Sequence, residues 1–303
     1  MRSRNPTLGL ALVVLAAALF IQNAGVSRVA LRGGVDPLTL TTVRVTGTFL
    51  VLLVVAAVFR RDALRPPRGR LGLLLVAHGL VGVAALQWTY FVAIDRLPVG
   101  MALLLEYQAP ILVALWARFV QREQVRPRLW LGLALAWGGL AAATGIWRGL
   151  TLDLLGILGG LGAAVCFAAY FLIGEHGVAK LDPMRVILWS FLWATVGLNL
   201  VHPVSSLPPA LLDDRVTLLA WIVVVGTVLP FALELMALGH LRATTVTMVA
   251  MLEPIGVSAL GWVWFAESLD AVAVVGGVAV VAGIAVAQSA RLSPVLVEPP
   301  HLA

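Results

Sequence analysis

Two glutamates, Glu106 and Glu253, lie deep inside long apolar runs and are the side chains best suited to do chemistry in this sequence. Glu106 lies about eight residues, or roughly 12 Å, into the run 98–119, and Glu253 about ten residues, or roughly 15 Å, into the run 243–266. An ionisable group at such depth is costly in lipid and usually faces a cavity or a partner. A carboxyl group in apolar surroundings also takes up a proton readily, as a proton relay requires. The pair could therefore bind a substrate amine or a coupling proton, or only hydrogen-bond a neighbouring helix.

Arg44 is a basic residue that falls well inside an apolar run, 37–59. It lies about seven residues, or roughly 10 Å, beyond Pro37. Its planar guanidinium could clamp a substrate carboxylate through two parallel hydrogen bonds. It could equally pair with Glu106 or extend toward the membrane surface, and the sequence favours such a structural role.

Several other polar or amphipathic side chains interrupt the apolar runs. Binding sites for small molecules combine apolar walls with a few such groups, although each of them taken alone is more often a packing or interfacial residue. The predicted substrate-binding residues are Gln87, Tyr90, Tyr107 and Tyr170, together with Glu106, Glu253 and Arg44; Gln22, Asn23, Trp88, Gln108 and Glu234 show the same pattern.

Other kinds of chemistry have no recognisable signature in the sequence. It contains no G-x-x-x-x-G-K-[ST] motif for nucleotide phosphates, and its histidines lack the spacing of metal ligands. The single cysteine, Cys166, allows no intrachain disulfide. We therefore expect no catalytic residue, metal or cofactor. The alternative is an intramembrane enzyme that acts on a lipid or small metabolite, but it needs a nucleophile or metal constellation within the runs.

The composition places these residues in a lipid bilayer. Of the 303 residues, 61% are hydrophobic and 12% charged, and the mean hydropathy is +1.00. A soluble domain has about 45–50% apolar and about 25% charged residues. The net charge of +6 does not indicate nucleic acid as a partner, because the arginines lie between apolar runs, where they act as topology signals.

Ten apolar runs are each close to the roughly 20 residues that cross a hydrocarbon core. Lipid offers backbone groups no partner outside their own segment, so each run is predicted to be a helix, and the runs do not alternate as in a β-barrel. The fold class is therefore all-α, a polytopic membrane protein with ten transmembrane helices. The runs are 8–27, 37–59, 71–94, 98–119, 129–147, 153–174, 184–203, 216–238, 243–266 and 271–289.

The distribution of basic residues predicts the orientation. If the N-terminus is cytoplasmic, fifteen Lys and Arg residues lie on the cytoplasmic side and five on the other. Cytoplasmic loops carry an excess of these residues. We therefore expect a multi-pass plasma-membrane protein with both termini in the cytoplasm.

The two halves of the chain repeat at an offset of 144 residues. We expect five helices in each of the units 8–147 and 153–289, followed by a short cytoplasmic tail, 290–303. Because five is odd, the second unit enters the membrane with the opposite polarity, and such inverted repeats are typical of secondary transporters. The matched pairs include Pro110 and Pro254, Glu123 and Glu267, Gly132 and Gly276, and Gly139 and Gly283.

These motifs resemble the EamA-type repeat of the drug/metabolite transporter superfamily. The resemblance rests on Asp36-Pro37 followed by Arg44, on the run 105–110 followed by Glu123, and on the run 252–254 followed by Glu267. It extends over about residues 8–289 and implies ten helices, two inverted repeats and a central cavity. It also implies export of amino acids or related metabolites. At the position equivalent to Arg44, the second repeat has Ser190.

The combined expectation is a secondary transporter that works by alternating access. Carboxylates outnumber bases at depth, which suits a small-molecule substrate that bears an ammonium group, or a proton as coupling ion, with Glu106 and Glu253 as the coupling residues. A phosphorylated substrate would need several basic residues in the cavity, and only Arg44 is available.

Overall fold

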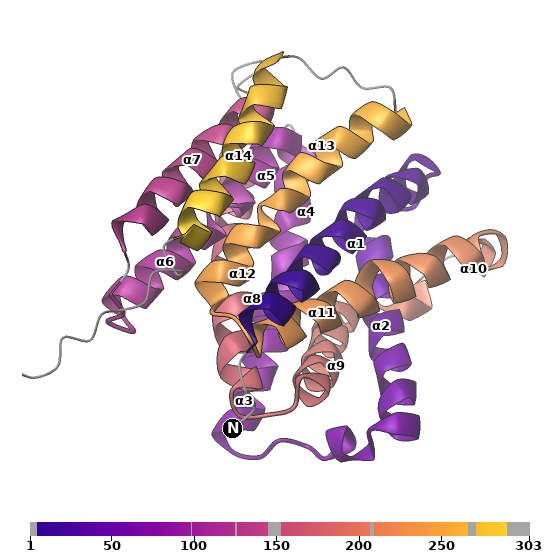
Figure 1. Cartoon of the computed structure of the whole chain (residues 1–303). Helices are drawn as coiled ribbons and strands as arrows, with labels where there is room; N and C mark the ends of the chain where they lie inside the picture. The colour runs from indigo at the N-terminus through magenta and orange to yellow at the C-terminus, as the bar shows by residue number, and fades with distance from the viewer. Residues whose placement is uncertain are drawn as a thin grey trace, which may run out of the picture.

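The computed structural model describes residues 5–97, 99–124, 126–144, 153–206, 209–265 and 271–289, and within these ranges it contains helices and no strand. The helices form a single bundle (Figure 1). The all-α prediction is confirmed, and the expected tail, 290–303, lies outside the described residues.

The helices follow the expected apolar runs, several of them divided into shorter segments. The first half contains α1 (Pro6–Arg32), α2 (Pro37–Phe59), η1 (Arg61–Leu64), α3 (Arg70–Ala77), η2 (His78–Ala85), α4 (Leu86–Arg96), α5 (Val99–Glu106), α6 (Ala109–Phe119) and α7 (Pro127–Thr144). The second half contains α8 (Leu154–Val178), α9 (Pro183–Val201), η4 (Val204–Ser206), α10 (Pro209–Val223), η5 (Val224–Val228), α11 (Leu229–Leu238), α12 (Ala243–Ala250), α13 (Leu252–Phe265) and α14 (Ala271–Ser289).

The two Asp-Pro motifs each begin a helix. Asp36 accepts a hydrogen bond from the backbone N–H of Thr39, and Asp182 accepts one from Met184. Each aspartate thus satisfies an amide that has no partner within its helix, and the proline that follows occupies the first turn, where its missing N–H costs nothing. The same local chemistry therefore starts α2 and α9, the corresponding helices of the two halves.

Eight helical segments are long and apolar enough to cross a membrane. The spans expected at 129–147 and 271–289 correspond to α7 and α14, which are not among these eight, and residues 145–147 lie outside the described ranges. Length and composition thus support eight of the ten predicted spans.

Four of the expected helices are interrupted, at matching places in the two halves. The runs 71–94 and 216–238 contain the π-helical segments η2 and η5. The runs 98–119 and 243–266 break at Tyr107–Gln108 and at Met251. Proline explains the breaks, because Pro110 and Pro254 cannot donate to the carbonyls four residues earlier, those of Glu106 and Ala250. At the offset of 144 the breaks and the π-helical segments superimpose, which sequence patterning alone did not reveal.

Helices α7 and α14 pack against each other in antiparallel directions at very close range (Figure 1). A Cβ atom added at Gly132 would lie 2.5 Å from the Gly283 carbonyl oxygen, and one added at Gly139 would lie 2.5 Å from that of Gly276. Only glycine allows backbones to approach this closely. The four glycines are two matched pairs of the repeat, and each half contributes one member to each contact.

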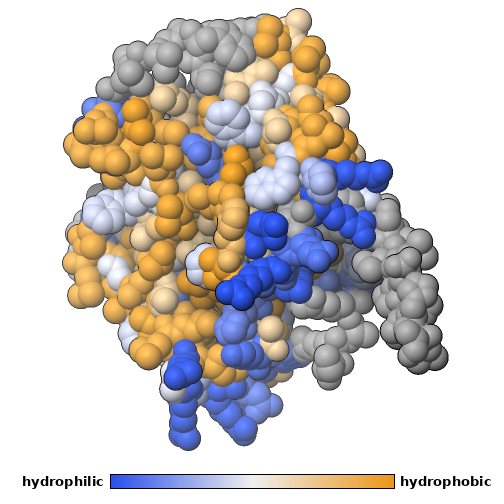
Figure 2. All heavy atoms as spheres, turned by 90° about the vertical axis from the view of Figure 1, so that its left-hand side faces the viewer, coloured by the Kyte–Doolittle hydropathy of each residue, from blue (hydrophilic) through white to orange (hydrophobic). Residues whose placement is uncertain are grey.

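The face that carries α7 and α14 is suited to lipid. Figure 2 shows a broad area of hydrophobic atoms on this side, with hydrophilic residues gathered toward one end. Large apolar side chains are exposed along both helices, and water would not favour so extensive an apolar surface. They include Leu131, Leu135, Val274, Val275, Val278 and Val281.

Helix α8 lies at the centre of the bundle, where it contacts α4, α5, α6, α9, α11, α12 and η2. Its Tyr170 and Phe171 are almost completely buried. Their rings pack edge-on against each other and Tyr170 packs edge-on against Phe231, which fixes the face of α8 turned toward α11. This aromatic core positions the polar side chains of the candidate site.

Candidate functional site

The two helix breaks meet through a hydrogen bond between Tyr107 and Glu253. The Tyr107 hydroxyl donates to Oε2 of Glu253 at 3.0 Å. Tyr107 directly follows α5 at the first break and is only 4% exposed, while Glu253 lies in the first turn of α13, beyond the second break. A carboxylate there is favoured by the amides at the start of the helix. The structure thus brings together two of the predicted site residues from opposite halves of the chain.

A third carboxylate, Glu234 on α11, is buried beside the Tyr170 hydroxyl, whereas Glu106 and Glu253 are partly buried. Glu234 is 2% exposed and Tyr170 is 1% exposed. The Tyr170 hydroxyl forms no hydrogen bond of normal geometry with any described residue, although it faces Glu234 and Glu253. A buried phenol usually finds a partner, so this hydroxyl is available to a ligand. Glu234 showed the pattern of a polar group within an apolar run but was not among the predicted binding residues.

Glu106, Glu234 and Glu253 all lie around Tyr107. In the part of the chain that the structure describes, none of the three forms an ion pair with Lys, Arg or His. Removing an ionised carboxylate from water without a partner costs several kcal/mol. The three carboxyl groups therefore concentrate acceptors for protons or for a cationic ligand.

Arg44 lies on α2 and is held inside the bundle by Thr227 of η5. Its Nε donates to the Thr227 hydroxyl at 3.2 Å, and that hydroxyl donates to the Ile222 carbonyl at 2.8 Å. Tyr90 lies between Arg44 and Glu106 as a neighbour of both. Within the described ranges the structure shows no ion pair between Arg44 and Glu106. Since only Nε is engaged by described residues, the two terminal nitrogens remain open to an anionic group.

Gln87 and Tyr90 lie three positions apart on α4, and side chains at this spacing share one face of a helix. Both amide atoms of Gln87 are buried, and neither forms a hydrogen bond to a described residue. Buried amides are seldom left in this state. Gln87 can therefore donate to a ligand and accept from it.

The structure does not bring all the predicted polar residues to this centre. Trp88 is 51% exposed and points away from the core, and Gln22 is exposed as well. Asn23 is buried farther along α1, where it accepts from the Ser27 hydroxyl at 3.3 Å. Gln22 and Trp88 are surface residues of the bundle.

His78 is a buried polar residue that the sequence did not assign to the site. Its Nδ1 lies 2.7 Å from the Ser190 hydroxyl and its Nε2 lies 3.0 Å from the Tyr170 carbonyl oxygen. Its ring also stacks on that of Tyr170, with 4.9 Å between the centroids. His78 therefore positions Tyr170 from η2, and the only sequence signal was a histidine within an apolar run.

A pocket of about 640 Å³ lies away from this centre, between the C-terminal end of α1 and the second half of α10. Its walls are mostly apolar, and Arg215 lies at its edge, where it donates to the carbonyls of Ala30 and Gly33. None of the predicted site residues lines it. Among the described residues there is no group of three His, Cys, Asp or Glu side chains arranged to hold a metal ion.

Comparisons with known proteins agree with the architecture. The model of the EamA-like transporter family matches residues 7–145 and 154–288. An "Uncharacterized transporter" of Archaeoglobus fulgidus is 29% identical over 89% of this chain and 92% of its own length. The threonine/homoserine exporter RhtA of Escherichia coli K12 is 29% identical over 74% of this chain and 73% of its own, and that of Salmonella typhimurium LT2 is 28% identical over the same shares.

A crystal structure superimposes on the chain with a TM-score of 0.78. The match covers 95% of this chain and 98% of the other, at 19% sequence identity. At this identity the likeness is one of fold alone.

Proposed function

Because the chain belongs to the EamA-like transporter family, we propose that it is a secondary transporter that exports amino acids or related amine-bearing metabolites across the plasma membrane. The observation that carries the substrate class is the placement of Glu106, Glu234 and Glu253 around Tyr107. Three carboxyl groups at one place favour a ligand with an ammonium group. The likeness to threonine/homoserine exporters supports the same substrate class.

An amino acid presents two charged groups, and the candidate site has a counterpart for each. The ammonium group binds Glu253 and Glu234. The hydroxyl of Tyr107 lies beside Glu253, and that of Tyr170 lies beside Glu234. The carboxylate binds the terminal nitrogens of Arg44, whose planar fork suits two parallel hydrogen bonds. The buried amide of Gln87 and the hydroxyl of Tyr90 supply further contacts to the substrate.

Proton exchange fits the same carboxylates, with Glu106 and Glu253 as coupling residues. When a substrate ammonium leaves the site, the carboxylates that it neutralised are left buried without a cation. A proton that enters from outside the cell then neutralises these carboxylates. The next substrate molecule binds only in exchange for this proton. Inward movement of protons thereby drives outward movement of the amine.

Alternating access follows from two inverted five-helix units, 8–147 and 153–289. Support comes from the antiparallel packing of the corresponding helices α7 and α14 and from the matched helix breaks. The excess of basic residues places both termini in the cytoplasm. In this arrangement a cysteine introduced at Arg65 reacts with an impermeant reagent only from the cytoplasm, and one at Asp214 only from outside. Labelling of both from one side contradicts the inversion.

Everted membrane vesicles test the proposed function. We expect vesicles that contain the chain to accumulate labelled threonine or homoserine when their interior is acidified, and to accumulate less when the pH gradient is collapsed. A labelled sugar phosphate should not accumulate, because the site offers one arginine rather than a basic cluster. Accumulation of the sugar phosphate alone contradicts the proposal.

A further inference from the structure

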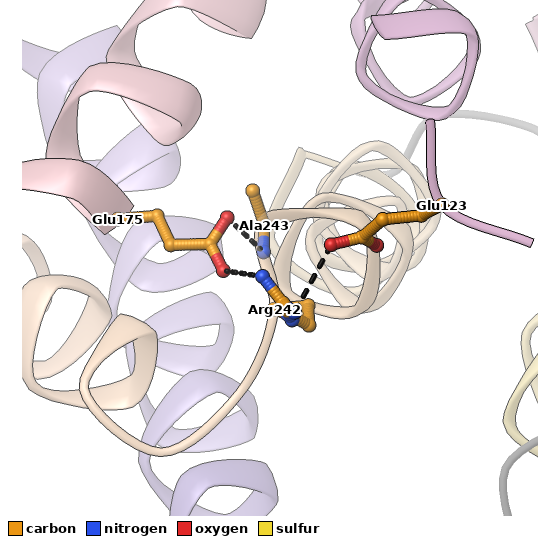
Figure 3. Close-up of polar contacts among 4 residues, drawn as sticks. All are labelled: Glu123, Glu175, Arg242 and Ala243. Carbon is orange, nitrogen blue, oxygen red and sulfur yellow. Dashed lines mark hydrogen bonds and ion pairs between the residues drawn. The ribbon is translucent and has the colours of Figure 1, made fainter. Parts of the chain in front are cut away.

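An ion-pair cluster at one end of the bundle joins three of the segments that lead to the candidate site. Arg242 contacts Oε1 of Glu123 through Nη2 at 3.0 Å and Oε1 of Glu175 through Nη1 at 3.5 Å (Figure 3). The second oxygen of Glu175 accepts from the backbone N–H of Ala243 at 3.3 Å. We propose that this cluster, which we call the Arg242 clasp, is a gate that closes one end of the substrate path.

Each member of the Arg242 clasp lies on a segment that leads directly to the site. Glu175 follows Tyr170 by five residues on α8. Arg242 precedes α12, which runs to the break before Glu253. Glu123 follows α6, the helix that begins after Tyr107. One arginine therefore holds together three elements whose separation would open the bundle at this end.

The burial of Glu175 distinguishes its contact with Arg242 from a surface ion pair, whereas Arg242 and Glu123 are 47% and 34% exposed. The Glu175 side chain is only 11% exposed, and its two oxygens bind the guanidinium and the start of α12 at once. The carboxylate is further stabilised by the positive end of that helix. Arginine suits the position because its planar fork presents two nitrogens to different acceptors, which an ammonium group does less well. The pair of Arg60 and Asp182 joins α2 to α9, and its carboxylate is 31% exposed, against 11% for Glu175.

The N-terminus of α1 covers the same end of the bundle. The backbone N–H of Asn5 donates to Nδ1 of His240 at 3.2 Å. A Cβ atom added at Gly9 would lie 2.6 Å from the Leu241 side chain, so α1 packs tightly on the loop before Arg242. The opposite end of α1 contacts Arg215 instead. The structure thus represents the state in which the Arg242 end is closed.

The gate rests on the proposed transport function, because a path has to open at this end only if a substrate crosses it. Passage requires α12 to separate from both α8 and α6, and this breaks the contacts of Arg242 to both carboxylates. Loss of the guanidinium charge therefore shifts the protein toward the state that is open at this end. The state that is open at the opposite end loses population.

Two cysteine reporters test the gate in the full chain, reconstituted in lipid nanodiscs, with Cys166→Ala removing the native thiol. Thr247 is 1% exposed and lies on α12 between the Arg242 clasp and the site. Asn23 is 5% exposed and contacts Gly226 in the part of the bundle that is remote from Arg242. We expect Arg242→Gln to raise the maleimide labelling rate of the T247C reporter at least fivefold and to leave or lower that of the N23C reporter.

Arg60→Gln is the matched control, because it removes an arginine–carboxylate pair that involves neither α8 nor α12, and it should change neither rate. Glu123→Gln is a second route to the same result, and it should raise labelling of T247C by a smaller factor. Unchanged T247C labelling in both variants would overturn the gate. An equal rise at both reporters would also overturn it, since it indicates a loosened fold. Selective opening without amino acid transport leaves the gate intact and contradicts only the proposed substrate.

Discussion

The hydroxyl of Tyr107 donates a 3.0 Å hydrogen bond to Oε2 of Glu253, although 146 residues separate the two in the sequence. Each residue lies at a proline-induced break of a predicted span, one in each half of the chain. The bond therefore joins the two irregular backbone segments, where the bundle is least constrained by helix geometry. A change at one break is transmitted directly to the other.

Tyr107→Phe should reduce transport by roughly five- to tenfold and lower stability by about 1 kcal/mol, which is typical of one lost hydrogen bond. The ring still packs edge-on against Phe167, so the fold should be retained. Initial rates of labelled threonine uptake, together with thermal melting of the purified protein, check this expectation. If uptake remains at the wild-type rate, the bond contributes to structure alone.

Glu234→Gln should reduce transport at least tenfold, which corresponds to a loss of about 1.4 kcal/mol or more of interaction with the substrate. Glutamine keeps the size of the side chain but has neither its charge nor its exchangeable proton. Glu106→Gln should have a comparable effect. The control is Asp62→Asn, because the Asp62 side chain is 90% exposed and lies outside the site. Normal uptake by Glu234→Gln would exclude this carboxylate from substrate binding.

Arg44→Lys should impair transport of amino acids more than transport of amines that lack a carboxylate. Lysine keeps the charge but cannot present two parallel donors to a carboxylate, nor donate from Nε to Thr227 in the same geometry. Parallel uptake of an amino acid and its decarboxylated amine measures the difference. Equal loss of both, or of neither, would assign Arg44 a structural role.

Gly139→Ala should destabilise the protein by about 1–3 kcal/mol, the usual cost of forcing extra volume into a packed interface. The added methyl group would lie 2.5 Å from the Gly276 carbonyl oxygen, so α7 and α14 would have to move apart. The neighbouring Gly138 is the matched control, because a Cβ atom there meets nothing within 4 Å. A lower melting temperature is expected for Gly139→Ala and not for Gly138→Ala. The same melting temperature in both variants would contradict the packing.

The sequence predicted those features that depend on a single residue or on a continuous run of apolar residues. The apolar runs and the glutamates Glu106 and Glu253 within them each have a local cause, and the structure contains both. Glu234 was not selected, because no motif distinguished one polar residue in an apolar run from another. The partner of Glu123 also could not be predicted. The structure places Arg242 against it through a contact between segments that lie far apart in the sequence.

A competition assay tests whether the carboxylates of Glu106, Glu234 and Glu253 recognise the amine of the substrate. Purified protein in liposomes preloaded with unlabelled threonine is given labelled threonine outside, and counterflow is measured with an excess of homoserine or of the deaminated hydroxy acid. We expect homoserine to abolish counterflow. The deaminated acid should leave the rate of counterflow within about twofold of its original value. Equal inhibition by both compounds, or no counterflow above that of protein-free liposomes, would contradict this recognition.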